Sequence, residues 1–413
     1  MELKNLIMTL FCLCLSFYSC EKKETEPKEQ AGRTVLAYLL AADSDSRLNA
    51  KLHQNISDMY KGLSEMDKSC TLLIYWDGMA TDAYWPEPCL IKYETDGCGV
   101  VNKTRGLTDE GDIARSGVIL KTYPVQISTN VNVMTNVLRD MISAAPTDNY
   151  GLIIGSHGSG WLQSLSGTRA VGVDNSGENT IEIPALSDIL SASGLGKLDY
   201  LLFDDCLMGS AEVAYELRNE VKYCIASAME IPLYGFPYEH IMTNLYSADV
   251  AEYTQKVCDA FVKYYTDLGK GFGTPAVIDC DAMDELAVAM RREILSHPEL
   301  LPAVDTDLLQ QYARDEPDIF GEMKGLKYSS VDMLDFVAAL NDGEIPMDFQ
   351  VAFDNAVVYK TMVSGSSVGS LVIDPEHYSG LGMYVPVTHK ANWNTYFRNE
   401  ISWCYASGWD MVL

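Results

Sequence analysis

The stretch YLLFDDCLMG, from Tyr200 to Gly209, decides how the chain folds around its chemistry. Its first four residues form an apolar run too short for a helix, and two carboxylates and a thiol follow. The next segment, Ser210 to Leu217, opens with a Ser and carries an early Glu, which is typical of a helix start. Cys206 is therefore predicted at the carboxyl end of a buried strand, the edge at which α/β sheets bind ligands.

Two interpretations of Cys206 are open from this stretch. A thiol near helix-terminal N–H groups can ionise more readily than an ordinary cysteine, whose pKa is about 8.5. Unpaired cysteines are also among the most buried residues, so Cys206 could equally be a small core side chain. The rest of the chain has to decide.

Composition sets broad limits on the function. The 413 residues are 47% hydrophobic and 21% charged, which indicates a folded globular protein with one large domain or two. A net charge of −28 argues against nucleic acid as a partner, because phosphates need a basic surface. It suits cationic substrates, although solubility alone would explain it. The cysteines show no C-x-x-C or other zinc-type spacing, so no structural zinc site is expected.

The first thirty residues are predicted to be an export signal and a tether. Residues 1–19 have an early Lys, a short apolar run and a small residue at the end, as secretory signals do. The segment that ends at Cys20 resembles a loose bacterial lipobox, in which the Cys is lipidated; a plain signal peptide with an incidental Cys is the alternative. Residues 20–30 are charged and contain Pro, which suits a tether. We predict an outer-membrane lipoprotein that faces the periplasm or the cell surface.

Apolar runs and helical patterns alternate along the first part of the chain. Strands are predicted at 33–42, 70–76, 89–93, 150–155, 200–203 and 223–228, and helices at 48–63, 129–144 and 186–192. This alternation indicates an α/β protein with a mostly parallel sheet. After residue 246 helices dominate, at 250–268, 281–295, 331–340 and 349–362, with short strands at 276–279, 370–373 and 383–387. We place a soft domain boundary near residue 270.

His157 is the best partner for Cys206. It follows a predicted strand and lies in GSHGSGW, residues 155–161, where glycines allow a sharp turn and expose N–H groups. A His and a Cys at two strand ends are the ingredients of a base and a nucleophile. The segment GSSVG at 365–369 matches the serine-hydrolase elbow, but a predicted helix precedes it and a strand follows, so the order is wrong.

Three blocks, in this order, resemble the motifs of the clostripain-like cysteine peptidases. They are SHGSGW around His157, FDDCLMGSAEVAYEL around Cys206, and IASAMEIPLYGFPY at residues 225–238. The resemblance covers about residues 150–245 and extends more weakly on both sides. It implies a caspase-like three-layer α-β-α sandwich with a mostly parallel central sheet at residues 31–270. A C-terminal α+β domain or extension would follow at residues 271–413.

The resemblance also implies an endopeptidase that cuts after Arg or Lys. Cys206 would be the nucleophile and His157 the general base and acid, with backbone N–H groups of Gly158 and Cys206 binding the oxyanion. Asp204 would lie at the floor of the pocket for the basic side chain, or else be a helix N-terminal carboxylate. Asp205 departs from the small residue, usually Ala, that the family has there. It either points to the other face of the strand or adds to the acidity.

Members of this family often mature by cutting themselves between the His and Cys strands. In this chain that loop contains one basic residue, so we predict self-cleavage between Arg169 and Ala170. Its oxygen-bearing residues Asp174, Asn175, Glu178 and Asn179 could bind Ca²⁺, although a solvated loop is the alternative and no cofactor is required. We expect a monomer that acts on proteins or peptides with Arg or Lys at the cleavage site and meets the membrane through its lipid anchor.

Two other functions stay open at this point. One is a cell-surface lipoprotein that binds a partner on the same fold without catalysis. The presence of both His157 and Cys206 argues against it, because a binding module has no reason to keep both. The other is a different thiol enzyme, such as an acyltransferase.

Overall fold

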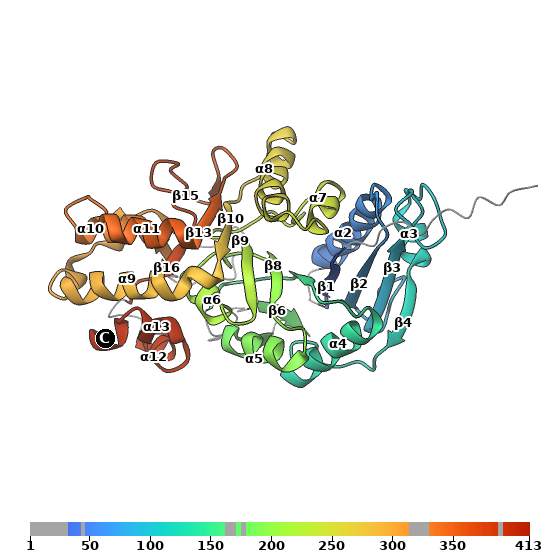
Figure 1. Ribbon diagram of the computed structural model, residues 1–413, viewed down its shortest axis with the longest axis horizontal. Helices are drawn as coiled ribbons and strands as arrows, with labels where there is room; N and C mark the ends of the chain where they lie inside the picture. The colour runs from blue at the N-terminus through green and yellow to red at the C-terminus, as the bar shows by residue number, and fades with distance from the viewer. Residues whose placement is uncertain (1–31, 43–45, 162–170, 175–178, 314–329, 387–390) are drawn as a thin grey trace, which may run out of the picture.

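The computed structural model describes residues 32–42, 46–161, 171–174, 179–313, 330–386 and 391–413 (Figure 1). Within these ranges no helix is long and apolar enough to cross a membrane. The signal, the lipidation site Cys20 and the tether lie outside the described residues.

A nine-stranded sheet forms the centre of the molecule. In spatial order its strands are β13 (Val357–Lys360), β10 (Pro275–Asp279), β9 (Val221–Ser227), β8 (Leu198–Asp204), β5 (Tyr150–Gly155), β1 (Thr34–Leu40), β2 (Cys70–Asp77), β3 (Cys89–Thr95) and β4 (Val118–Thr122). The five strands from β9 to β2 are parallel to one another, whereas the two at each edge pair antiparallel. The prediction of a mostly parallel sheet is confirmed.

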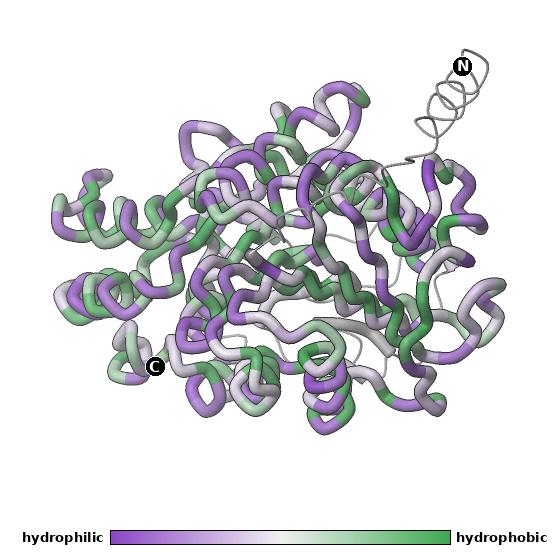
Figure 2. Tube along the Cα trace, turned by 45° about the vertical axis from the view of Figure 1, so that its right-hand side comes forward, coloured by the Kyte–Doolittle hydropathy of each residue, from purple (hydrophilic) through white to green (hydrophobic). Residues whose placement is uncertain are grey.

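Helices cover both faces of the sheet (Figure 1). One face carries α2 (Ser46–Ser64), α3 (Glu110–Ser116), α7 (Tyr238–Leu245) and α8 (Val257–Asp267), and the other carries α4 (Val131–Ala144), α5 (Ile183–Ser193), α6 (Ala211–Glu216) and α9 (Met283–Ser296). Alternate residues of β1 enter the two cores, Val35, Ala37 and Leu39 on the α2 side and Leu36, Tyr38 and Leu40 on the α4 side. A strand buried on both faces must be apolar throughout, which explains its continuous apolar run. The three-layer sandwich is confirmed, and Figure 2 shows the apolar residues gathered along the central strands.

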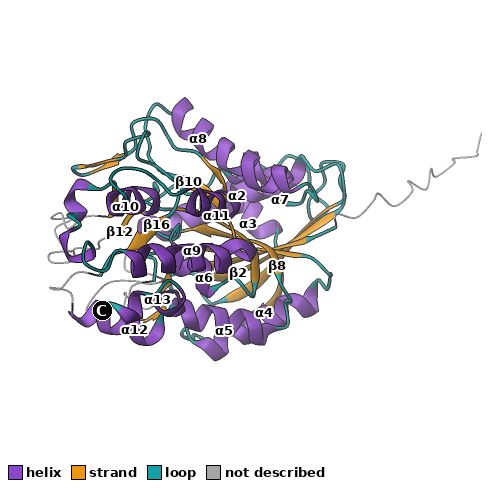
Figure 3. Cartoon of the chain, turned by 60° about the vertical axis from the view of Figure 1, so that its left-hand side comes forward, coloured by secondary structure: helices purple, strands orange, loops and turns teal. Residues whose placement is uncertain are grey.

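The C-terminal part adds two strands to the sheet and a group of helices at one end of it (Figure 3). The helices are α10 (Met333–Leu340), α11 (Met347–Ala356), α12 (Ala391–Glu400) and α13 (Ser402–Ala406). A small sheet joins β11 (Gln311–Ala313), β12 (Ser330–Asp332) and β16 (Gly382–Tyr384), and a hairpin joins β14 (Ser367–Val368) to β15 (Leu371–Val372). Residue 270 falls between α8 and β10, where β10 continues the main sheet; a division there stays a prediction.

Three expected elements have different bounds in the structure. The helix predicted at 349–362 is wrong in its second half, because Val357–Lys360 forms β13 and pairs with β10. β-Branched and aromatic residues favour a strand there once a partner strand is present. The helix predicted at 331–340 begins only at Met333, after β12. The stretch predicted as one helix at 250–268 contains the π-helical turn Glu252–Lys256 before α8.

Candidate active site

His157 and Cys206 follow two neighbouring strands at the same edge of the sheet. The parallel strands β5 and β8 are in register from Gly151 with Tyr200 to Gly155 with Asp204. His157 and Cys206 each come two residues after that last pair. Because paired strands lie about 4.8 Å apart, this register places the backbones of His157 and Cys206 close together at the carboxyl edge of the sheet.

Gly158 allows the two strand ends to approach closely. A Cβ atom at position 158 would lie 2.7 Å from the carbonyl oxygen of Cys206 and 2.8 Å from the Cβ of Asp205. Any side chain at 158 would therefore push the two backbones apart. The glycine after His157 is required by this contact, which places the backbone of Gly158 directly against that of Cys206.

The chain turns sharply after Cys206. Leu207 has a φ of 64°, a left-handed conformation that costs a residue with a side chain about 1 kcal/mol or more. The turn is fixed to the end of β9, because the N–H of Leu207 donates to the carbonyl of Met229 at 3.2 Å and that of Gly209 to Ser227 at 2.9 Å. Ser210 then caps α6 by accepting the N–H of Val213, as its position at a helix start predicted.

The thiol of Cys206 contacts the backbone of Ile231. The N–H of Ile231 lies 3.5 Å from Sγ, and the thiol donates to the carbonyl of the same residue at 3.8 Å. Although Cys206 is partly exposed, the packing around its sulfur raises the pKa of the thiol to about 12, and the nearby carboxylate of Glu230 adds to the rise. In this arrangement the sulfur is a neutral thiol.

Asp204 is buried on the α2 and α7 side of β8. Its carboxylate accepts hydrogen bonds from the Asn55 side chain at 3.2 Å, the Phe236 N–H at 2.9 Å and the Tyr238 hydroxyl at 2.8 Å. Burial raises the pKa of Asp204 to about 6, against the lowering effect of the Tyr238 and Phe236 hydrogen bonds. Gly235, which has a φ of 67°, passes so close to this carboxylate that a side chain there would clash with both oxygens. Asp204 does not cap α6, since Ser210 has that role.

A cavity of about 160 Å³ is lined by residues that contact Asp204, although Asp204 itself does not line it. Its lining includes Asn55 and Phe236, two of the three residues that hold the Asp204 carboxylate, together with the acidic side chains of Asp58 and Glu239. Lys61 lies between these two acids, 2.7 Å from Asp58 and 3.7 Å from Glu239. The cavity is polar, and Lys61, which also lines it, pairs with both of its acids.

Asp205 points away from Asp204 and joins the two strand ends. Its Oδ1 accepts the backbone N–H of Ser156, the residue before His157, at 2.6 Å. The side chain is 1% exposed, and burial together with the neighbouring Asp204 raises its pKa well above the usual range of an Asp.

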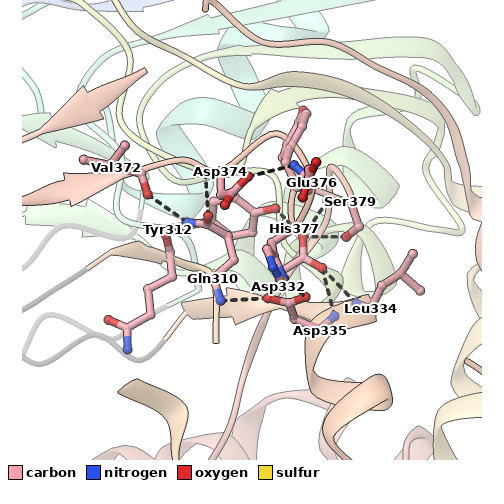
Figure 4. Close-up of polar contacts among 12 residues, drawn as sticks. Gln310, Tyr312, Asp332, Leu334, Asp335, Val372, Asp374, Glu376, His377 and Ser379 are labelled. Atoms are coloured by element: carbon pink, nitrogen blue, oxygen red, sulfur yellow. Dashed lines mark hydrogen bonds and ion pairs between the residues drawn. The ribbon is translucent and has the colours of Figure 1, made fainter. Parts of the chain in front are cut away.

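The C-terminal part supports the turn after Cys206. The N–H of Gly382 donates to Gly209 at 2.9 Å, and that of Tyr384 donates to Glu212 of α6 at 2.8 Å. The loop before β16 is held by the buried carboxylate of Asp332, which accepts the N–H and the hydroxyl of Ser379 at 2.7 and 2.6 Å (Figure 4). Residues of the C-terminal part thus stabilise the backbone that follows Cys206.

Several predicted features fall outside the described residues or beyond what the fold tests. Arg169 and Ala170 lie outside the described residues, as do Asn175 and Glu178 of the calcium hypothesis. In the described part of the chain no three His, Cys, Asp or Glu side chains form a group that could hold a metal. The GSSVG segment contributes β14 and its turn and does not lead from a strand into a helix, as expected.

Sequence reasoning did not find Asn55, Ile231 and Tyr238, which contact Asp204 or Cys206. Ile231 and Tyr238 lie inside the block IASAMEIPLYGFPY, so that block was the available signal for them. Asn55 lies 149 positions before Asp204 on an amphipathic helix, and no local pattern marks it.

Residues 38–313 match the family model described as the clostripain family. A secreted C11 cysteine protease from Bacteroides thetaiotaomicron, in complex with an irreversible peptide inhibitor, is 24% identical, over 92% of this chain and 100% of its own, with a TM-score of 0.73. An inactive zymogen C11 protease from Parabacteroides distasonis is 26% identical, over 92% of this chain and 98% of its own, with a TM-score of 0.70. No curated protein sequence matches.

Proposed function

Because the chain belongs to the clostripain family of cysteine peptidases, we propose that it is an endopeptidase that cleaves after Arg or Lys with a Cys206–His157 dyad. The observation that carries the proposal is the register of β5 and β8. Both strands end at the pair Gly155 and Asp204, and His157 and Cys206 each follow two residues later. Acyl transfer requires a base and a nucleophile within reach of each other, and their places at the ends of two adjacent strands support this pairing.

In the proposed reaction the thiol first has to leave Ile231. With a pKa of about 12 it is not a nucleophile at neutral pH, so a bound substrate would replace the Ile231 contacts and His157 would take the proton. The resulting thiolate attacks the scissile carbonyl, and the N–H groups of Gly158 and Cys206 receive the oxyanion. Their backbones lie in contact, which supports a shared role. His157 then protonates the leaving amine, and water releases the acyl-enzyme.

Asp204 would select the basic side chain. It lies two residues before Cys206 on the same face of the chain, and both contact the core on the α2 and α7 side. A carboxylate with a pKa of about 6 is ionised at neutral pH and would attract a guanidinium or ammonium group.

The remaining parts of the proposal concern maturation and location. We infer that the enzyme cuts its own Arg169–Ala170 bond. In the sequence this bond follows β5 and directly precedes β6 (Val171–Asp174), which pairs with β7 (Asn179–Ile181). Cys20 would carry the lipid that holds the monomer on the outer membrane. The proposed chemistry requires no calcium; a calcium ion, where bound, would be held by the oxygen atoms of Asp174, Asn175, Glu178 and Asn179.

The test is hydrolysis of fluorogenic peptides ending in Arg, Lys, Asp or Asn by the wild type and by Cys206→Ala. We expect Arg and Lys peptides alone to be cleaved, and the variant and an alkylated sample to lose about 10⁴-fold or more in kcat. On a denaturing gel the wild type should appear as two pieces and Cys206→Ala and Arg169→Ala as one. Activity of Cys206→Ala on Arg peptides would refute the dyad, and an intact wild-type chain that is fully active would refute self-cleavage.

A further inference from the structure

We propose that Asp205 is a positioning residue, which fixes the loop of His157 on the turn of Cys206 by accepting the backbone N–H of Ser156. The inference rests on the proposed roles of His157 and Cys206. It gives a function to the residue at which this chain departs from the Ala expected beside the nucleophile.

The first argument is the end of the β5–β8 ladder. The paired residues stop at Gly155 and Asp204, and shortly afterwards the chain turns sharply, with Leu207 in a left-handed conformation. The next N–H group of the β5 strand, that of Ser156, is buried and needs an acceptor. Oδ1 of Asp205 provides it at 2.6 Å, so a side chain extends the ladder by one hydrogen bond after the backbone of β8 has turned.

The second argument is what this bond holds in place. Ser156, His157 and Gly158 are consecutive, so fixing Ser156 fixes the start of the loop that carries both the predicted base and an oxyanion N–H. On the other side of the contact, the Cβ of Asp205 and the carbonyl of Cys206 lie against Gly158. Asp205 is therefore in contact with both halves of the dyad's backbone, at a place where a displacement of about 1 Å can cost about 10²-fold in rate.

The third argument is the environment of the carboxyl group. Oδ2 is buried and has no hydrogen-bond partner among the described residues. A negative charge there would be opposed by burial and by Asp204, and it would also act with Asp204 and Glu230 to hold the Cys206 proton in place. The neutral acid avoids both effects, because it accepts the Ser156 N–H without adding charge beside the thiol. An amide would do the same.

The experiment compares Asp205→Ala with Asp205→Asn in the full-length protein. Asp205→Ala removes the acceptor, and we expect kcat on Arg and Lys peptides to fall about 10- to 100-fold with KM changed less than about 3-fold. Asp205→Asn keeps a carbonyl acceptor, so kcat should stay within about 3-fold of the wild type. Hydrogen exchange at the Ser156 amide should be slow in the wild type and in Asp205→Asn and fast in Asp205→Ala.

Alkylation of Cys206 by iodoacetamide as a function of pH provides a readout that needs no peptide substrate. With a neutral Asp205, the midpoint in Asp205→Asn should lie within about 0.3 pH units of the wild type. If the wild type cleaves no peptide, the proposed function fails, while the exchange and alkylation data still decide the role of Asp205. Wild-type kcat in Asp205→Ala overturns the inference. A large loss of kcat in Asp205→Asn, with the Ser156 amide still protected from exchange, also overturns it. If Asp205→Ala does not fold, the result for Asp205→Asn alone decides.

Discussion

The buried carboxyl groups at the end of β8 and at Asp332 differ in how completely they are hydrogen-bonded. Asp332 accepts five hydrogen bonds, from the N–H groups of Leu334 and Asp335, the Tyr312 hydroxyl, and the N–H and hydroxyl of Ser379. Asp205 accepts one and has an oxygen without a partner in the described part of the chain. Asp204 is intermediate, with three donors and a cavity beside its partners.

Under the proposed function, this difference separates Asp332, which belongs to the fold, from Asp204 and Asp205, which would act in the site. A buried acid with a full set of donors is stabilised as part of the fold, and it has no capacity left for a ligand. A buried acid with an incomplete set costs stability, so its presence calls for a role in positioning or in binding. We therefore expect mutations at Asp332 to act on folding and mutations at Asp204 and Asp205 to act on catalysis.

The largest expected effect is that of Asp332→Ala. The variant would leave the Tyr312 hydroxyl and both donors of Ser379 facing an empty site, and we expect it to lose about 3–5 kcal/mol in the free energy of unfolding. Urea unfolding followed by circular dichroism measures the loss. The matched control is Asp112→Ala, which removes an exposed carboxylate paired with Arg115 and should change stability by less than about 0.5 kcal/mol. Equal stability of the two variants would break the comparison.

The second effect is that of Asp204→Asn, which should reduce kcat/KM for Arg and Lys peptides about 10- to 100-fold while the protein stays folded. The wild type should also lose activity on these peptides as the pH falls through about 6, because Asp204 is neutral below its raised pKa and no longer attracts a cation. The same raised pKa means that the native state holds the proton more tightly than the unfolded chain does. Ionisation of Asp204 therefore lowers the free energy of unfolding as the pH rises.

The measurement is a pH profile of kcat/KM for both proteins between pH 5 and 8. Asp204→Asn should lack the rise near pH 6, with any dependence due to the dyad alone. If Asp204→Asn keeps the wild-type pH profile and the preference for Arg, Asp204 serves only the fold, as Asp332 does.

The smallest effect concerns the rim of the Asp332 region, where His377 Nδ1 lies 2.8 Å from Asp335 (Figure 4). The Asp335 carboxylate raises the pKa of His377, so the ion pair stabilises the fold at low pH and the contribution is lost as the pH rises through the raised pKa. The side chain is 56% exposed, so the gain is screened by water. His377→Gln should cost about 0.5 kcal/mol or less at pH 5.5 and nothing at pH 8 in urea unfolding. A larger loss at pH 8 would contradict this sign.

The sequence predicted the fold where one local pattern was sufficient. Buried parallel strands such as β1 and β5 are apolar along their whole length, so 33–42 and 150–155 were recognisable without knowledge of their neighbours. The strand at Val357–Lys360 was missed because its identity depends on the edge of β10, which is distant in sequence. β4 was missed for a related reason, since all five of its residues are exposed and it shows no alternation.

The site was predictable to the same extent. His157 and Cys206 stand out because each follows an apolar run, and the block order gave them a family. The hydrogen bonds that decide what Asp204 and Asp205 do come from Asn55, Tyr238 and Ser156, on three other segments. Such contacts follow from the packing of α2, α7 and β5 around β8, which no local pattern contains.

The exposed strand β4 has a consequence for how copies of this molecule meet one another. It is the last strand of the sheet and carries Val118, Ile119 and Leu120 at 40–51% exposure. An apolar edge strand is a template on which a second chain can add, and this is how many β proteins aggregate. The net charge of −28 opposes that encounter by keeping like-charged molecules apart in solution. The excess of carboxylates therefore keeps the molecules apart in solution. Acidification or high salt weakens this repulsion and should favour association through β4.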